Sequence, residues 1–498
     1  MNANLYALFR AHFGERMEAP CILLADHSTI TYGELDATAA RFAHALLATG
    51  AHPGDRVAVQ VEKCWEALAL YLACLRAGLV YLPLNTGYQR AELAYFFGDA
   101  QPRVIVCEPE HLGVIAAQER GATVLTLDEL LARAESLPRQ FATVVSEPGD
   151  LAAILYTSGT TGRSKGAMLT HRNLASNALA LVDAWGFTRG DVLLHALPIY
   201  HVHGLFVAIH CALLSGARIL WLPKFDAREV ASLLPRATVM MGVPTFYTRL
   251  LAEPTFTPEI CRSIRLFVSG SAPLLAETFD AFVARTGQHI LERYGMTETG
   301  MITSNPLDGA RVGGTVGRPL PGVEVRIRDD NGGACGPDAI GGVQVRGPNV
   351  FSGYWRMPDK TREEFTDDGY FRTGDMGQWV GEGPGRGYLQ LVGRAKDLII
   401  TGGLNVYPKE IEDHIDQMEG VEESAVVGMP DPDFGEAVAA VIVGKPGHTL
   451  TEAGVIGALK GEIAKFKVPK RVFFQDQLPR NAMGKVQKAL LREKFSQV

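Results

Sequence analysis

Over its first 300 residues the chain alternates short runs of β-branched and aliphatic residues with segments of helical periodicity. No other feature limits the fold as strongly, because strands that alternate with helices pack into mostly parallel sheets with helical layers. An apolar segment at 65–76 is typical of a buried helix, and Thr31 followed by Glu34 has the spacing of a helix capping box. The strand-like runs are RVAVQV (56–61), VYLPL (80–84), RVIVC (103–107) and TVLTL (123–127). The pattern predicts an α/β architecture with doubly wound layers.

The character of the sequence changes twice after this region. From about residue 313 glycine becomes dense and the apolar runs shorten, as in VEVRI (323–327) and VQVRG (343–347), which favours a small antiparallel β subdomain or barrel. A compact tail follows the segment GRAKD (393–397), and a tail of about 100 residues suffices for a small α+β domain. The tail has helical patterns at 408–418 and 451–465 and strand-like runs at 424–428 and 437–443.

Composition and charge exclude several classes of function. The 498 residues carry 48 Lys and Arg against 55 Asp and Glu, a net charge of −7, without the basic excess typical of nucleic-acid binding. The seven cysteines are odd in number and none has CxxC or metal-ligand spacing, which argues against disulfides and zinc and favours a reducing compartment. No apolar run has the length of a membrane span, and the N-terminus resembles neither a secretory nor a transit peptide. The sequence predicts a cytoplasmic protein without nucleic-acid or membrane partners.

The strongest local signal is a loop rich in glycine and hydroxyl side chains, YTSGTTGRSKG (156–166), directly after the strand-like LAAIL. Backbone N–H groups and hydroxyls of such a loop can converge on an anion, and two cations add positive charge. A flexible Ser/Gly linker is the alternative, but linkers rarely carry two cations between apolar runs. The loop is not a Walker A motif, because Gly162 is followed by Arg163 and Lys165 by Gly166. Its candidate phosphate-binding residues are Thr157, Ser158, Gly159, Thr160, Thr161, Gly162, Arg163, Ser164 and Lys165.

Three shorter motifs carry further candidate nucleotide-binding residues. In YGMTE (294–298), Tyr294 could stack on a base, Thr297 could donate to a phosphate and Glu298 could bind Mg²⁺ through hard oxygens. In YFRTGD (370–375), Asp375 could accept hydrogen bonds from two ribose hydroxyls. In PRNAMGK (479–485), Lys485 lies on a glycine-containing loop near the end of the chain. Taken alone, each match is also typical of an ordinary turn with a solvated side chain.

The order of the motifs is far more specific than any one of them. The segments TSGTTGRSKG, SGSAPL (269–274), YGMTE, TGD, GRAKD and PRNAMGK follow one another over residues 157–485. In this order they resemble the adenylate-forming superfamily of acyl-CoA synthetases, luciferases and peptide-synthetase adenylation domains. The resemblance implies an α/β fold with a large N-terminal domain, residues 1–393, made of two doubly wound sheets and a small β-barrel subdomain. It also implies a mobile α+β C-terminal domain, residues 398–498, on a hinge at about 394–397.

The resemblance further implies an ATP-dependent acid–CoA ligase that works in two steps. A carboxylate attacks the α-phosphorus of ATP to give an acyl-AMP and pyrophosphate, and the CoA thiol then displaces AMP. By resemblance, the glycine-rich loop holds the β- and γ-phosphates, Lys485 bridges the α-phosphate and the attacking carboxylate, and Lys396 is the hinge residue. Mg²⁺ is expected on Glu298 and Thr161. The other implied residues are Ser271, Ala272, Pro273, Tyr294, Gly295 and Met296 at adenine, Asp375 and Arg394 at the ribose, Thr297 at phosphate, and Gly402 and Gly403 at the CoA tunnel.

The choice of acid depends on side chains in PIYHVHG (198–204), GVPTFYTR (242–249) and IR (264–265). Arg249, on an expected helix, is predicted to put a fixed cation in the acyl pocket, which calls for a second carboxylate on the substrate. A surface arginine is the alternative, and Arg265 is the second candidate for the role. The sequence of the whole chain resembles those of bacterial malonyl-CoA synthetases, which also accept methylmalonate. By that resemblance the pocket is bordered by His201 as an aromatic gate, by Val202 in place of a threonine found in some members, and by Ser269 and Met301.

Other interpretations stay open on the sequence alone. One is a synthetase of the same superfamily for a short-chain, medium-chain or aryl monocarboxylic acid. Another is an inactive nucleotide-binding scaffold, although Glu298, Asp375, Lys485 and the loop are intact. A peptide-synthetase adenylation domain is less favoured, since we expect no carrier domain after Val498. The predicted partners are a small dicarboxylic acid, ATP and CoA, bound by a monomer or a homodimer.

Overall fold

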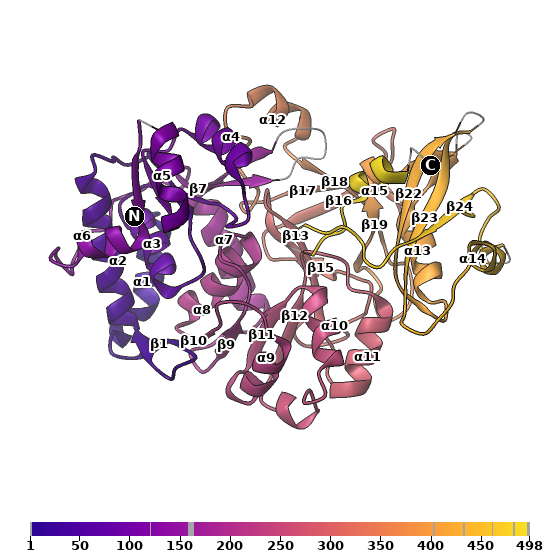
Figure 1. Ribbon diagram of the computed structural model, residues 1–498, viewed down its shortest axis with the longest axis horizontal. Coiled ribbons are helices and arrows are strands. Elements are labelled where there is room, and N and C mark those ends of the chain that lie inside the picture. The colour runs from indigo at the N-terminus through magenta and orange to yellow at the C-terminus, as the bar shows by residue number, and fades with distance from the viewer. Residues whose placement is uncertain are drawn as a thin grey trace.

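The computed structural model describes residues 2–119, 121–157, 164–401, 404–431, 434–460, 462–481 and 484–495. Within these residues the strands form four sheets, and the chain passes from two large, mainly parallel sheets through a small antiparallel sheet into a C-terminal α+β unit (Figure 1). The α/β fold class predicted from the sequence, with a smaller C-terminal unit, is confirmed.

The first large sheet has six strands in the order β6–β5–β3–β4–β7–β8, and only β7 and β8 pair antiparallel. Its strands are continuously apolar because both faces are covered: Val57 and Val59 belong to one apolar cluster and Ala58 to another. The four strands predicted between residues 56 and 127 are all present. The strands are β3 (Arg56–Gln60), β4 (Val80–Pro83), β5 (Val104–Cys107), β6 (Thr123–Thr126), β7 (Leu151–Thr157) and β8 (Lys165–Thr170).

The second large sheet has nine strands in the order β15–β14–β13–β12–β11–β9–β10–β1–β2. The six strands from β13 to β1 are parallel, and antiparallel strands close both edges. Because the central strands are parallel, their carboxyl ends all lie along the same side of the sheet, and their amino ends along the other. The strands are β1 (Pro20–Leu23), β2 (Thr29–Thr31), β9 (Val192–His195), β10 (Arg218–Trp221), β11 (Val239–Gly242), β12 (Leu266–Ser269), β13 (Leu291–Met296), β14 (Gly300–Ser304) and β15 (Arg318–Pro319).

Helices pack around these two sheets. The capping box predicted at Thr31 and Glu34 is present at the start of α2, and the helix predicted at 65–76 is α3. Short single-turn segments are η1 (Gly14–Arg16), η3 (Leu234–Arg236) and η4 (Glu259–Cys261), and η2 (His203–Ile209) is a π-helix. The helices are α1 (Leu5–Phe13), α2 (Tyr32–Ala48), α3 (Trp65–Arg76), α4 (Arg90–Ala100), α5 (Pro109–Gln118), α6 (Leu127–Ala134), α7 (His171–Ala184), α8 (His210–Ser215), α9 (Ala227–Leu233), α10 (Pro244–Ala252) and α11 (Ala276–Thr286).

The predicted antiparallel β subdomain is a four-stranded sheet in the order β16–β17–β18–β19. Its alternating burial follows from one covered face, as at β17, where Gly341, Val343 and Val345 are buried. The helix α12 (Pro358–Glu364) lies between β17 and β18 in the chain. The strands are β16 (Glu324–Arg328), β17 (Gly341–Arg346), β18 (Phe371–Trp379) and β19 (Leu389–Arg394).

The C-terminal unit is an α+β arrangement around the long hairpin of β22 and β23, which carries one apolar cluster on each face. The short segment η5 (Ala395–Asp397) joins it to β19 at the predicted hinge; the domain limits and the hinge motion stay predictions. The helix expected over 451–465 is shorter than predicted, since it ends at Leu459. The elements are β20 (Ile399–Thr401), β21 (Leu404–Val406), α13 (Pro408–Asp416), β22 (Val421–Asp431), β23 (Gly435–Gly444), α14 (Glu452–Leu459), β24 (Arg471–Phe474) and α15 (Lys488–Phe495).

Two of the exclusions drawn from composition can be compared with the structure. All seven cysteines are free and five of them are buried, as expected of small apolar side chains in a core. Among the described residues, no helix combines the length and the apolar character needed to cross a membrane.

Candidate active site

One group of the candidate residues lies where the second large sheet presents the carboxyl ends of its parallel strands. At this edge β11 ends at Gly242, β12 at Ser269 and β13 at Met296. The segments that follow these strands, 243–245, 270–273 and 297–299, are the ones singled out in the sequence. In an open parallel sheet this edge is where ligands bind, because strand ends and helix starts leave polar groups there.

Asp375, the predicted ribose ligand, is held from two sides. It lies opposite Arg394 across the β18–β19 pair, and Arg394 Nε is 2.8 Å from Asp375 Oδ1. The hydroxyl of Tyr294 donates to Asp375 Oδ2. A second guanidinium nitrogen of Arg394 donates to the carbonyl of Thr373 at 2.9 Å, which fixes the arginine as well. The structure therefore brings together three side chains predicted at adenine and ribose.

Lys485, on a loop of the C-terminal unit, lies within electrostatic range of Asp375 and Arg394. A Cβ atom on Gly484 would lie 3.6 Å from Thr245 Oγ1, so the loop that carries Lys485 packs on the first turn of α10. The pKa of Lys485 is lowered to about 8. The larger cause is that surrounding protein atoms remove water from the ammonium, and the next is the positive charge of Arg394, although the side chain keeps contact with solvent. The hinge candidate Lys396 is exposed and also lies within electrostatic range of Lys485.

Thr297 and Glu298 lie in the turn between β13 and β14. Glu298 is only 5% exposed, and burial raises the pKa of its carboxyl group. Its Oε1 accepts a hydrogen bond from the hydroxyl of Tyr354 at 3.0 Å, and its backbone carbonyl accepts one from the N–H of Phe351 at 2.7 Å. A carboxylate held in this way offers hard oxygens of the kind that Mg²⁺ prefers.

The glycine-rich loop is described only at its two ends. Thr157 pairs with Lys165 in the β7–β8 hairpin, and the carbonyl of Ser164 accepts a hydrogen bond from Tyr95 at 2.7 Å. Lys165 Nζ lies 4.2 Å from the ring centre of Tyr354, the residue that also contacts Glu298. The predicted phosphate and CoA residues that lie outside the described part of the chain are Ser158, Gly159, Thr160, Thr161, Gly162, Arg163, Gly402 and Gly403.

The adenine candidates Ser271, Ala272 and Pro273 follow β12 directly. Ser271 has a positive φ of 72° and its hydroxyl lies 3.2 Å from Nδ1 of His203. On the neighbouring strand Gly295 leaves no room for a side chain, since a Cβ there would lie 2.2 Å from the carbonyl oxygen of Gly300. Ser271 is thus fixed next to His203, and the Gly295 backbone packs directly on β14.

Arg293 is a candidate functional residue that sequence reasoning missed. Its guanidinium lies against Gly270, where a Cβ would come within 2.3 Å of Arg293 Cζ, and the residue is only 4% exposed. Its Nε and one terminal nitrogen have no hydrogen-bond partner among the described residues. Burial lowers the pKa of Arg293 to about 9. A buried guanidinium with unused donors is unfavourable unless an anion completes it.

Three more polar side chains lie near this guanidinium. Burial, and next the charge of Arg293, lower the pKa of His201 to about 4, so the imidazole is neutral at pH 7. The same two causes lower the pKa of His203, whose Nε2 lacks a partner in the described part of the chain. The hydroxyl of Ser269 is likewise without a partner there. Its place in the sequence could have indicated Arg293 as a candidate. It directly precedes Tyr294 on a strand, and neighbouring residues of a strand face opposite sides of the sheet.

The two arginines predicted in the acyl pocket lie apart from the buried group around Arg293. Arg265 directly precedes β12 and so lies at the amino end of this strand, whereas Ser269 is at its carboxyl end. The guanidinium of Arg265 binds both oxygens of Asp191 at 2.8 and 2.9 Å. Arg249 lies on α10 as expected but is exposed, in an open surface groove with Asp226 and Glu253. The helical repeat of α10 turns Arg249 outward, and the direction of β12 puts Arg265 at the start of the strand. Neither residue joins the buried group around Arg293.

A prediction follows from the position of Arg265. Arg265→Ala removes the charge partner of Asp191, which is buried at the amino end of the sheet, so we expect a loss of roughly 2 kcal/mol in the free energy of unfolding. Arg249→Ala, by contrast, removes an exposed side chain and should leave stability unchanged. Denaturant unfolding with intrinsic tryptophan fluorescence measures both. The outcome that contradicts this assignment is a stable Arg265→Ala variant with a raised KM for its acid substrate.

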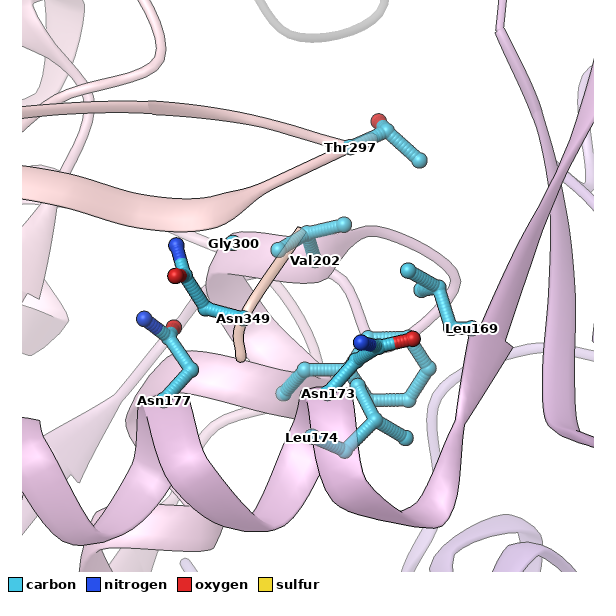
Figure 2. Close-up of a pocket in the computed structure, with 9 residues that line it drawn as sticks. Leu169, Asn173, Leu174, Asn177, Val202, Thr297, Gly300 and Asn349 are labelled. Carbon is cyan, nitrogen blue, oxygen red and sulfur yellow. The ribbon is translucent and has the colours of Figure 1, made fainter. Parts of the chain in front are cut away.

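The wall beside Val202 is closely packed (Figure 2). A cavity of about 10 Å³, enough for about one water molecule, is lined by Val202, Thr297 and Gly300 on one side and by side chains of α7 on the other. Asn177 of α7 exchanges hydrogen bonds of 2.9 and 2.8 Å with the backbone N–H and carbonyl of Met301. Val202 thus lines this cavity beside Thr297, and the backbone of Met301 is hydrogen-bonded to α7.

Comparison with known proteins identifies the class and then the relatives. The model of the AMP-binding enzyme family matches residues 9–355, and that of the AMP-binding enzyme C-terminal domain matches residues 410–485. The chain belongs to this family of AMP-binding enzymes, as the motif order predicted. It is 39% identical over 465 residues to the mitochondrial malonate–CoA ligase of Mus musculus, covering 84% of this chain and 78% of the relative.

Solved structures give the same result. The chain is 55% identical to ATP-bound MatB from Rhodopseudomonas palustris, covering 100% of this chain and 99% of that chain, with a TM-score of 0.97. Against apo MatB from the same organism, at the same identity and coverage, the TM-score is 0.86. The overall structure of this chain is therefore more similar to that of the ATP-bound form.

Proposed function

We propose that this protein is an AMP-forming acid–CoA ligase that converts malonate, ATP and CoA into malonyl-CoA, AMP and pyrophosphate, and that it also accepts methylmalonate. The observation that carries the proposal is the buried guanidinium of Arg293, with two nitrogens unpartnered among the described residues. The likeness to malonate–CoA ligase and to MatB supports the same activity.

In the first half-reaction, one carboxylate oxygen of malonate attacks the α-phosphorus of ATP and pyrophosphate leaves. Both reactants are anions, so the protein contributes mainly position and positive charge. Lys485 supplies an ammonium that can contact the carboxylate and the α-phosphate together. Asp375 accepts the ribose hydroxyl hydrogens, and Arg394 orients that carboxylate from 2.8 Å away. The pairing of these residues supports an assembled adenylation site.

Mg²⁺ fits the oxygen donors of this site. Glu298 would hold it, with Thr161 as the second predicted ligand, and the bound ion would neutralise charge on the phosphates of ATP. The hydrogen bond from Tyr354 at 3.0 Å keeps the Glu298 carboxylate in one orientation. Lys165 and the glycine-rich loop bind the departing pyrophosphate in this proposal.

The second carboxylate of malonate is bound by Arg293. Transfer of this anion into the buried site becomes favourable only because a guanidinium with unused donors is already there, while a neutral hydrocarbon tail would leave that cation unpaired. Ser269 and His203 offer further polar contacts, since their hydroxyl and Nε2 have no partners in the described residues. This charge requirement favours a dicarboxylic acid over the short-chain, medium-chain and aryl monocarboxylic acids.

In the second half-reaction, the CoA thiol attacks the acyl carbonyl of malonyl-AMP and AMP leaves. We propose that the C-terminal unit turns about Lys396 between the two steps, which removes Lys485 from the site and brings Gly402 and Gly403 to the CoA tunnel. The exposed position of Lys396 on η5 is compatible with a pivot. Free cysteines favour a reducing, cytoplasmic setting for this reaction.

A panel of acids tests this function. Purified protein is supplied with ATP, Mg²⁺ and malonate, methylmalonate, acetate, butyrate or coumarate, and pyrophosphate release is measured with and without CoA. We expect kcat/KM for malonate to exceed that for each monocarboxylic acid by about 10³-fold or more, because a site built for a buried charge rejects a ligand that lacks it. Equal activity on butyrate or coumarate would favour the alternative synthetase, and no activity on any acid would favour the inactive scaffold.

A further inference from the structure

A short segment between β17 and α12, residues 351–355, joins two parts of the nucleotide site that are far apart in sequence. The N–H of Trp355 donates to the carbonyl of Gly166 at 2.8 Å, and the N–H of Met168 donates to that of Gly353 at 3.0 Å. At its other end the N–H of Phe351 donates to the carbonyl of Glu298 at 2.7 Å. The segment is therefore fixed both to β8, which follows the glycine-rich loop, and to the turn that carries Glu298.

Tyr354 repeats this connection with its side chain. The residue is 3% exposed and forms an antiparallel bridge with Ala167 of β8. Its hydroxyl donates to Glu298 Oε1 at 3.0 Å, while the ammonium of Lys165 lies 4.2 Å from the centre of its ring. Its backbone N–H donates to the hydroxyl of Thr361 at 2.9 Å, which limits rotation of the whole residue. One side chain thus contacts the carboxylate assigned to Mg²⁺ and the cation assigned to phosphate.

The two contacts have different physical effects. The phenol hydroxyl donates a hydrogen bond to the carboxylate of Glu298. This hydrogen bond stabilises the charged form of the carboxylate and fixes the direction of its oxygens, as groups that hydrogen-bond to metal ligands do. The aromatic face attracts Lys165 without adding a formal negative charge, so it does not compete strongly with phosphate oxygens.

Glu364 provides the exchangeable partner of Lys165. Its Oε1 lies 3.5 Å from Lys165 Nζ and 3.2 Å from Lys360 Nζ. When phosphate oxygens replace Glu364 at Lys165, the carboxylate keeps its ion pair with Lys360, so no charge is left isolated. The ring of Tyr354 holds the ammonium in place during this exchange.

We propose that Tyr354 is a positioning residue that sets the spacing between the Glu298 carboxylate and the Lys165 ammonium for binding of Mg²⁺-ATP. This inference rests on the proposed use of Mg²⁺-ATP and adds a residue that acts through two others. Tyr354 itself does not touch the reacting atoms.

The test separates the hydroxyl from the ring. Tyr354→Phe keeps the ring, and Tyr354→Leu removes both contacts. Tyr370→Phe is a matched control, because Tyr370 also donates to a carboxylate, Glu324, at 2.7 Å and has guanidinium groups over its ring, but lies directly before β18. ATP binding to each full-length protein is measured by isothermal titration calorimetry across a range of Mg²⁺ concentrations and in EDTA, without any acid substrate.

For Tyr354→Phe we expect the Mg²⁺ concentration at half-maximal ATP binding to rise about 10-fold, with the Kd for ATP in EDTA unchanged. Tyr354→Leu should in addition weaken ATP binding in EDTA about 3-fold, because Lys165 loses its contact with the ring. Tyr370→Phe should change neither value. In a Glu298→Gln background, where the metal carboxylate is absent, Tyr354→Phe should have no further effect on the Mg²⁺ dependence.

Three results would overturn the inference: a wild-type Mg²⁺ dependence for Tyr354→Phe, an equal loss of ATP affinity with and without Mg²⁺, or an undiminished effect in the Glu298→Gln background. Failure of the proposed use of Mg²⁺-ATP looks different, since ATP binding by the wild-type protein would then not depend on Mg²⁺. Thermal melting of each variant verifies that the compared proteins are folded at the assay temperature.

Discussion

Arg293→Met is expected to lower kcat/KM for malonate by about 10³-fold, or roughly 4 kcal/mol, and to do so mainly through KM. Methionine keeps much of the side-chain volume but cannot pair with a carboxylate. The second carboxylate of malonate would then lose its water on entry without gaining the guanidinium, whose donors are otherwise unused in the described residues. Steady-state kinetics of pyrophosphate release, with malonate and ATP varied separately, measures the effect.

The same substitution should change substrate preference in a definite direction. Butyrate carries no second charge, so Arg293→Met should leave its kcat/KM unchanged or raise it, and the KM for ATP should stay within about 2-fold of wild type. Arg249→Ala is the control, because that arginine is exposed in a surface groove of α10. If Arg293→Met kept its preference for malonate while Arg249→Ala lost it, the second carboxylate would be bound at Arg249 after all.

The fold could be predicted because its signals are local. Buried parallel strands are short, continuously apolar and separated by helices, and this pattern is present in the sequence between residues 56 and 127. Nucleotide-site residues such as Tyr294, Asp375 and Arg394 could also be chosen in advance, because they lie in short motifs whose order along the chain is specific. Their mutual contacts across β13, β18 and β19 could not be predicted, since they depend on how separate sheets pack.

The cation of the acyl pocket could not be located from spacing. Arg265 and Ser269 are four residues apart, but β12 lies between them, and at about 3.3 Å a residue this puts them at opposite edges of the sheet. On α10, Tyr247 and Leu250 are buried, and the helical repeat turns Arg249 outward. Arg293 follows the opposite logic: Tyr294 faces Asp375, so the preceding residue of the strand faces the other side, toward Gly270.

Lys485→Ala is expected to separate the two half-reactions. We expect malonate-dependent exchange between ATP and labelled pyrophosphate to fall by about 10³-fold, because the ammonium between the two reacting anions is lost. Thioester formation from supplied malonyl-AMP and CoA should stay within about 3-fold of wild type, because Lys485 has left the site in that step. Equal losses in both half-reactions would show that the lysine acts in folding or in general binding instead.

The pH dependence of wild-type protein gives an independent measure of the same residue. Surrounding protein atoms, followed by Arg394, lower the pKa of Lys485 to about 8, so its ammonium is the main form below that pH and is lost above it. Because kcat/KM reports groups of the free enzyme, kcat/KM for ATP in the exchange assay should fall as the pH rises through about 8. The thioester half-reaction should show no such fall. In Lys485→Ala the alkaline limb of the exchange profile should disappear along with most of the rate, whereas a limb that persisted at the same pH would have to belong to another group at the nucleotide.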